Sequence, residues 1–127
     1  MVDVSDLIGV NYAEHGRCME AGFDCWGLLL EVERRMGKDI PDFDYIMHDD
    51  KFVDDNARKQ IVEGHAKKVL GLSEGVIILF ENAAGLKNHV GVYLGDGYFV
   101  HCNGNGVHLD KIDTYSHLKK GYYIWQN

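Results

Sequence analysis

The sequence contains few of the residues on which several classes of protein depend. Its three cysteines are too few, and odd in number, for a disulfide framework, and no pair has the two-residue gap of a zinc knuckle. Thirteen lysines and arginines stand against 20 acidic residues, a net charge of −7 that argues against general nucleic-acid binding. No apolar run approaches the ~20 residues that a membrane-spanning helix needs, so we expect no membrane insertion.

The first residues also lack the features of a secretion signal. Residues 1–6 are acidic and have neither the basic start nor the apolar core of a signal peptide. We therefore expect the protein to be made in the cytoplasm without a signal peptide.

The overall composition is that of an ordinary folded protein. The chain has 127 residues, of which 46% are hydrophobic and 26% charged. It has no internal repeat, no low-complexity tract and a single proline. These values predict one globular domain over residues 1–127 and exclude disorder and fibrous architecture.

The first half of the chain reads as helical. Asp24 is a plausible N-cap for a helix over residues 25–36, and Gly37 supplies a left-handed stop. Within it, Glu31 can pair with Arg35 one turn later. A single broad face is apolar enough to be mostly buried.

A second amphipathic helix is predicted after an acidic stretch. We expect it over residues 55–70, with Ile61, Val62 and Val69 on the inner side and Gly71 after its end.

The pattern then changes to short apolar runs bounded by glycine, which predict strands. The expected strands are 76–80, 88–94, 98–102, 107–109 and 122–125. Helices followed by strands predict an α+β domain in which N-terminal helices pack on a mostly antiparallel C-terminal sheet.

Cys25 is the strongest candidate nucleophile. As the first residue of a helix it lies among unpaired backbone N–H groups at the positive end of the helix dipole, which favours the thiolate. The same N–H groups could stabilise an oxyanion beside the sulfur. The alternative for an isolated cysteine is a small buried apolar residue.

Two histidines on neighbouring strands are candidate partners for this thiol. His89 opens one strand and His101 lies near the end of the next. A two-residue turn at 96–97 would put them on opposite faces. A three-residue loop, which pairs Leu94 with Tyr98, would put them on one face within imidazole reach. We predict the three-residue loop.

These residues form a possible catalytic relay. Cys25 attacks, His89 takes its proton and a neutral His101 orients His89, although it does so more weakly than a carboxylate would. Gly91, opposite His101 in this register, would leave room for a substrate or another element. The alternative is that the cysteine and the two histidines bind Zn²⁺.

Two blocks of sequence resemble the NlpC/P60 family of cysteine peptidases, small papain-like enzymes that cut bacterial cell-wall peptides. The first is residues 8–28, in which Asp24-Cys25-Trp26-Gly27 is similar to the family's Asp-Cys-Ser-Gly pattern. The second is residues 89–101, similar to the family's histidine strand and third polar residue. The resemblance spans nearly the whole chain and implies a papain-like NlpC/P60 fold.

The resemblance implies a role for each matching residue. Cys25 is the nucleophile, His89 the base and His101 the orienting residue, and the Tyr12 hydroxyl helps the oxyanion hole. The implied substrate is the amide between the side-chain carboxyl of D-glutamate and a diamino acid in a peptidoglycan stem peptide. An acyl-enzyme forms and water releases it.

Two positions depart from the family pattern. Trp26 stands where most members have serine, and this form, with Pro41-Asp42-Phe43 beyond the helix, resembles the subgroup encoded in tailed-phage tail modules. We therefore expect tail-tip proteins as partners and the virion as a location. Val76 replaces an aspartate that is not catalytic.

The remaining expectations concern the cleft and the alternatives. We expect His15, Asp24 and Trp26 to line the substrate cleft, and no cofactor or catalytic metal. One alternative is a catalytically silent tail-tip structural or adaptor protein. Another is an amidase or acyltransferase that uses the same triad, because a fold and a triad do not fix the acceptor.

Overall fold

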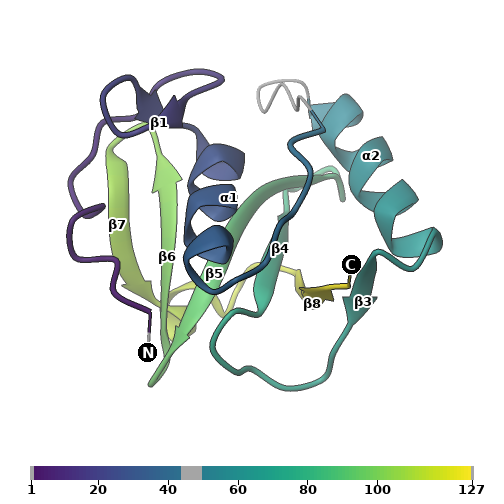
Figure 1. The fold of residues 1–127 in the computed structure, drawn as a ribbon. Helices are drawn as coiled ribbons and strands as arrows, with labels where there is room; N and C mark the ends of the chain where they lie inside the picture. The colour runs from purple at the N-terminus through teal and green to yellow at the C-terminus, as the bar shows by residue number, and fades with distance from the viewer. Residues whose placement is uncertain (1, 44–49, 127) are drawn as a thin grey trace.

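Two helices precede a six-stranded sheet in the computed structural model, which describes residues 2–43 and 50–126 (Figure 1). The helices are α1 (Cys25–Arg35) and α2 (Asp50–Val62), and two short strands, β1 (Arg17–Cys18) and β2 (Gly22–Phe23), come before α1. The large sheet contains β3 (Ala66–Lys68), β4 (Ile77–Glu81), β5 (Lys87–Gly95), β6 (Tyr98–Asn103), β7 (Gly106–Lys111) and β8 (Lys120–Trp125). A 3-10 helix, η1 (Ile112–Tyr115), follows β7. Within the described ranges, no helix is long and apolar enough to cross a membrane.

The sheet is antiparallel throughout its described pairs. Its strand order is β3-β8-β4-β5-β6-β7, so the last strand lies between the first and second strands of the sheet. This is the predicted α+β arrangement of helices first and an antiparallel sheet second. The five predicted strands are confirmed within two residues at each end, and the short strand β3 was not predicted.

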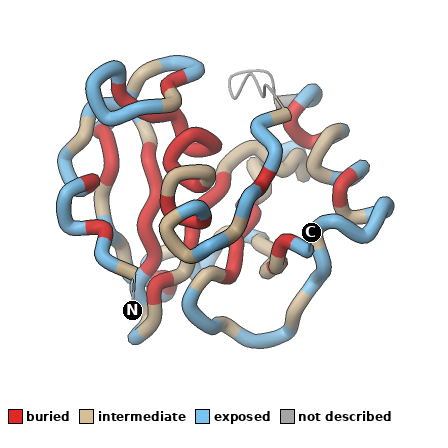
Figure 2. Tube along the Cα trace, in the orientation of Figure 1, coloured by how far each residue is buried: buried red, intermediate tan, exposed pale blue. Residues whose placement is uncertain are grey.

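The two faces of the sheet have different cores. Helix α1 packs on β5 and β6, and much of this region of the chain is buried (Figure 2). The buried apolar residues of α1 join the even-numbered residues of β5 and β6 in one large cluster. The odd-numbered side chains of β5 and β6 point to the other face of the sheet. A smaller cluster there contains Phe80 of β4 and Phe99 of β6. Each fully buried Leu, Val or Phe contributes roughly 1.5–3 kcal/mol, so the α1 face supplies most of the apolar stabilisation.

Helix α1 matches its prediction closely. The Asp24 side chain caps it, Met36 ends it, and Gly37 adopts the left-handed conformation with φ 85°. The expected pair forms, with Arg35 Nε donating to Glu31 Oε2 at 2.8 Å.

The prediction for the second helix was wrong at both ends. Helix α2 begins at Asp50 and stops at Val62, which is 85% exposed rather than on the inner side. Gly64 adopts φ 82°, and the following residues then pair with β8 as strand β3. Pairing along a free sheet edge therefore overrides the helical pattern after Val62. Val53 is the buried apolar residue of this helix.

The turn between β5 and β6 also differs from the prediction, yet the register does not. Gly95 pairs with Tyr98 across a two-residue turn, in which Asp96 and Gly97 both have positive φ, as a type I′ turn requires. A bulge then shifts the pairing by one residue between Tyr93 and Gly95. The bulge restores the register that the three-residue loop was expected to give.

Candidate active site at the start of helix α1

Cys25 is the first residue of α1, as expected. Asp24 accepts a hydrogen bond from the Gly27 backbone N–H at 2.7 Å, which fixes the first turn of the helix. Asp24 is itself held by Arg17, whose Nη1 donates to the same carboxylate oxygen at 2.8 Å while Nε binds Asp42 at 2.9 Å. Arg17 was not singled out in the sequence, because its two partners are distant from it along the chain.

Gly27 is required by close packing at this helix start. A Cβ atom at Gly27 would lie 2.0 Å from the carbonyl oxygen of Gly16. The segment that leads into β1 therefore packs directly on the helix backbone, and only glycine permits that approach.

The expected lowering of the Cys25 pKa is wrong for this structure. Cys25 is buried, and burial raises the pKa of its thiol to about 12. Hydrogen bonds from the backbone N–H groups of Val90 and of Cys25 itself oppose this shift, whereas the charge of Asp24 adds to it. In this structure, the desolvation of the thiol outweighs the stabilising effect of the helix N-terminus on the thiolate.

His89 and His101 are brought together as predicted. Nε2 of His89 and Nδ1 of His101 are 2.8 Å apart, so both rings lie on one face of the hairpin. Burial, followed by the neighbouring His101 and His108, lowers the pKa of His89 to about 3. The His89 imidazole is therefore neutral at physiological pH.

A carboxylate that the sequence analysis missed completes this arrangement. His101 Nε2 lies 2.7 Å from Asp110 Oδ2, and the Tyr115 hydroxyl donates to the same oxygen at 2.8 Å. Burial opposes ionisation of Asp110, but these two hydrogen bonds more than offset it and hold its pKa below the usual range. Asp110 follows two residues after His108, which is opposite His101 on β6, so strand alternation was a usable signal.

The ionised carboxylate determines where the protons lie in the chain of rings. A carboxylate only accepts, so His101 carries its proton on Nε2 and presents the Nδ1 lone pair. His89 must then carry its proton on Nε2, which leaves the lone pair of His89 Nδ1 free to accept a proton. Asp110 thus sets the tautomers of both histidines.

The room expected above Gly91 is filled. A Cβ atom at Gly91 would lie 2.7 Å from Cδ2 of Phe99, because the Phe99 ring lies across that glycine. The centroid of the same ring is 4.5 Å from that of His101. Gly91 therefore lets an aromatic ring support the orienting histidine and does not open space for a substrate.

The thiol and the two rings approach β5 from different sides. Cys25 belongs to the core cluster on the α1 face, whereas His89 contacts Phe80 on the other face, with ring centroids 5.5 Å apart. The backbone N–H of Val90 is among the groups that lower the Cys25 pKa, so the thiol lies close to the residue that follows His89. The paired register of β5 and β6 ends at Val92 opposite Val100, so the two strands are not held in register beside His89.

A groove of about 300 Å³ lies beside the two histidines. Asn88 and Asn103 from the strand ends and Tyr115 from η1 line it together with the rings of His89 and His101. This groove lies on the histidine face of the sheet, where the amide and hydroxyl groups offer hydrogen bonds to a peptide.

The other predicted site residues have different surroundings. Tyr12 is 41% exposed and forms a backbone bridge to Phe23, two residues before Cys25. Burial raises the pKa of Tyr12, and the charge of Asp24 adds to this shift. His15 is exposed in a turn, with φ 57°.

Asp24 and Trp26 were expected to line an open cleft, and both are instead buried. Asp24 is the helix cap. The Trp26 indole N–H donates to the Asp42 carbonyl, and its ring lies 6.2 Å from that of Phe43.

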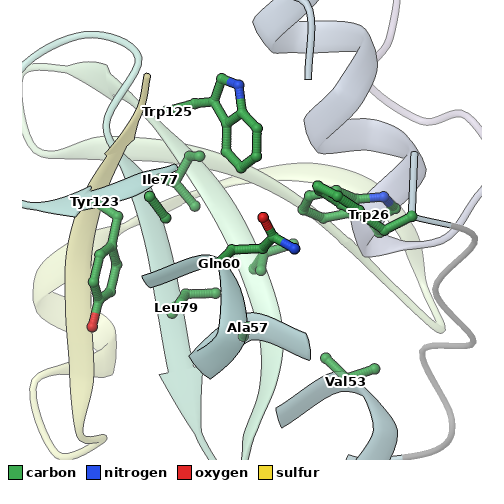
Figure 3. A pocket seen from close by; sticks show the side chains of 11 residues that line it. Trp26, Val53, Ala57, Gln60, Ile77, Leu79, Tyr123 and Trp125 are labelled. Carbon is green, nitrogen blue, oxygen red and sulfur yellow. The ribbon is translucent and has the colours of Figure 1, made fainter. Parts of the chain in front are cut away.

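The Trp26 ring faces an apolar cavity of about 50 Å³ between α2 and the sheet (Figure 3). Trp125, Ile77 and Leu79 enter it from the sheet and Ala57 from α2. Trp26 thus holds the segment around Asp42 in place and does not line a surface groove.

Comparison with known proteins identifies relatives of this chain. The model of the NlpC/P60 family matches residues 9–125. The chain is 31% identical over 117 residues to the bifunctional muramidase/DL-endopeptidase CwlT of Bacillus subtilis, covering 91% of this chain and 30% of that protein. The chain therefore spans about a third of the length of this relative.

Solved structures share the fold. The NlpC/p60 domain of the peptidoglycan hydrolase SagA superposes with a TM-score of 0.60 at 22% identity, covering 91% of this chain and 88% of that one. An NlpC/P60 family protein from Bacillus cereus gives a TM-score of 0.66 at 23% identity, covering 95% of this chain and 37% of that one. The α+β architecture is therefore that of papain-like NlpC/P60 domains, and the chain belongs to the NlpC/P60 family.

Proposed function

We propose that this chain is a cysteine endopeptidase that cleaves amide bonds in peptidoglycan stem peptides, with Cys25 as nucleophile, His89 as base and His101 as orienting residue. The observation that carries the proposal is the hydrogen-bonded series His89–His101–Asp110, with distances of 2.8 and 2.7 Å. It leaves Nδ1 of His89 able to accept a proton, and His89 is adjacent in sequence to Val90, whose N–H lowers the Cys25 pKa. Membership of a family that includes a DL-endopeptidase at 31% identity supports the substrate class.

The reaction follows from the tautomers. As the Cys25 sulfur attacks the substrate carbonyl, its proton moves to His89 Nδ1 and a carbon–sulfur bond forms. The resulting imidazolium is stabilised through His101 by the Asp110 charge. His89 then gives the proton to the leaving amine, the carbon–nitrogen bond breaks, and an acyl-enzyme remains.

Water completes the cycle. His89 Nδ1 takes a proton from water as the oxygen attacks the thioester, and the proton returns to the sulfur when the acid product leaves. We assign backbone N–H groups at the start of α1 as donors to each oxyanion, other than that of Gly27, which binds Asp24. The Tyr12 hydroxyl is assigned as a further donor.

The high pKa of the buried thiol fits proton transfer during attack rather than a resting ion pair. A thiol with a pKa near 12 and an imidazole with a pKa near 3 are both neutral before substrate binds. Attack therefore requires that His89 accept the proton in the same step.

The proposed substrate site is the groove beside the histidines. Its asparagines and Tyr115 can hydrogen-bond a stem peptide, while the acidic net charge of −7 favours the amine of a diamino acid. His15, exposed before β1, is proposed to lie at the edge of this site.

The test is digestion of purified peptidoglycan followed by mass spectrometry of the soluble fragments. We expect stem peptides cut between D-glutamate and the diamino acid from the wild type and none from Cys25→Ala. Equal fragment yields from both proteins would remove Cys25 from the mechanism. Fragments cut at another amide would keep the triad and change the substrate assignment.

The burial of Cys25 favours one competing function, a catalytically silent tail-tip component. The phage-tail association itself remains a prediction from the Asp24-Cys25-Trp26-Gly27 motif and the segment around Asp42, which Trp26 contacts. Absence of any cleavage by the wild type, with an intact fold, would favour the silent component.

A further inference from the structure

Three side chains of types that can bind metals lie close together at the Asp110 end of the His89–His101–Asp110 series. His101 on β6 is directly opposite His108 on β7, and Asp110 follows on the same face of β7. One ring nitrogen from each histidine and one Asp110 oxygen all lie within 4.8 Å of one another. Asp110 Oδ2 is 2.7 Å from His101 Nε2 and 3.1 Å from His108 Nε2.

The His108 ring is held with its lone pair toward the carboxylate. Its Nδ1 is 3.0 Å from the Gly106 carbonyl oxygen, and a carbonyl only accepts, so Nδ1 carries the proton of the neutral ring. The lone pair of Nε2 then faces Asp110 Oδ2 at 3.1 Å, so two acceptors face each other. A cation between them, either a proton or a metal ion, relieves this contact. A backbone carbonyl on the second nitrogen is also the usual way in which proteins orient a metal-binding histidine.

We propose that His101, His108 and Asp110 bind one divalent zinc-type ion, which reversibly inhibits the enzyme. Two nitrogens and one carboxylate oxygen, with water as a fourth ligand, are a donor set that zinc prefers over magnesium or calcium. Tetrahedral ligands about 2.1 Å from zinc are roughly 3.4 Å apart, so the cluster needs to open by less than 1 Å at its closest pair. His108 and Asp110 are half-exposed, which gives the ion access from solvent.

The inhibition rests on the proposed function and follows from the proton positions. An ion on His101 Nε2 replaces the proton there, and that proton moves to Nδ1, so the ring stays neutral. His101 now donates to His89 Nε2, and the His89 proton moves to Nδ1. The nitrogen that would accept the thiol proton is then already protonated, with no proton gained or lost overall.

Binding is tested first, in a background that removes competing thiols. In Cys18→Ser/Cys25→Ala, calorimetry with ZnCl₂ is expected to show one ion per chain. Adding His108→Gln should weaken binding at least 10-fold, while the matched control His117→Gln, an exposed histidine outside the cluster, should leave it unchanged. Thermal unfolding of each variant verifies that it is folded.

Equal zinc affinity with and without His108→Gln would overturn the site. Absence of zinc binding in the background variant would overturn it equally. These results do not depend on catalysis, so they are distinguishable from failure of the proposed function.

The inhibitory step has its own readouts. In the same background, ¹⁵N shifts of the His89 and His101 rings should show both tautomers exchanging on zinc addition, and unchanged shifts would contradict the step. In the enzyme with Cys25 intact, the zinc concentration for half inhibition should rise at least 10-fold in His108→Gln, each variant being compared with its own zinc-free rate. Unchanged sensitivity would assign inhibition to zinc on Cys25 and His89 instead.

Discussion

Glu33 and His101 are buried to the same extent on opposite faces of the sheet, yet their surroundings differ. Each is 2% exposed. Glu33 Oε1 has no hydrogen-bond partner among the described residues, and burial raises the pKa of this carboxyl to about 7. His101 instead has partners on both ring nitrogens, at 2.8 and 2.7 Å.

Glu33 and His101 differ in how hydrogen-bond partners affect a buried polar group. An unpartnered carboxyl responds to burial by holding its proton, and it lowers stability when it ionises. A fully bonded imidazole has its tautomer and orientation fixed, so it can position a neighbour. Burial alone therefore does not mark a functional group, whereas burial with a complete set of directed hydrogen bonds does.

The largest effect on catalysis is expected from removing the Asp110 carboxylate, which accepts a hydrogen bond from His101. Asp110→Ala should lower kcat/KM about 100- to 1,000-fold, because His101 loses the acceptor that sets its tautomer. Asp110→Asn should lose less, because its amide oxygen can still accept from His101 Nε2. Steady-state kinetics on a stem peptide measures both. Equal losses in both variants would mean that the charge, rather than the tautomer, is what matters.

The aromatic support of His101 should be sensitive to a single methyl group. We expect Gly91→Ala to destabilise the fold by about 1–3 kcal/mol, because its Cβ would lie 2.7 Å from the Phe99 ring. Gly104→Ala is the matched control, since nothing lies within 4 Å of a Cβ atom there. Urea unfolding compares the two, and an unchanged midpoint for Gly91→Ala would show that the Phe99 ring can move aside freely.

The buried carboxyl of Glu33 should make the free energy of unfolding depend on pH. The pKa of Glu33 is about 7 in the folded chain against 4.5 for an exposed glutamate. The stability that protonated Glu33 contributes to the folded state is therefore fully present below pH 4.5 and is lost as pH rises through 7. At pH 8 Glu33→Gln should therefore be more stable than the wild type by about 1–3 kcal/mol. At pH 4 this gain should vanish. The exposed control Glu20→Gln should show neither change, and a pH-independent gain in Glu33→Gln would mean that Glu33 does not titrate in this way.

The smallest effect tests where α2 ends. Val53 is 3% exposed and Val62 is 85% exposed. Val53→Ala should cost about 1–2 kcal/mol of unfolding free energy, whereas Val62→Ala should change it by less than about 0.5 kcal/mol. The reverse order in chemical denaturation would restore the longer helix with Val62 inside.

Signals from neighbouring residues in the sequence were sufficient to predict much of the fold and the pairing of the two histidines. The cap at Asp24, the stop at Gly37 and the alternation around His89 and His101 depend on neighbouring residues, and the structure agrees with each. The end of α2 depends on pairing between β3 and β8, which are far apart in sequence, so a helical pattern there was misleading.

The missed features also depend on tertiary contacts. Asp110 becomes important through its contact with His101, and the Cys25 pKa through packing of α1 on the sheet. The register of β5 and β6 at Val92 and Tyr93 was predicted for the wrong reason, since the bulge at Leu94 compensates for a shorter turn. Helix-start geometry could be read from the sequence, but the desolvation of the thiol could not.

The most direct test of the account is the rate of cleavage of a γ-D-glutamyl-diamino acid peptide by the wild type and by Cys25→Ala. We predict measurable cleavage at that amide by the wild type and a rate at least 1,000-fold lower for the variant, because the sulfur forms the acyl-enzyme. A Cys25→Ala rate equal to that of the wild type would contradict the account.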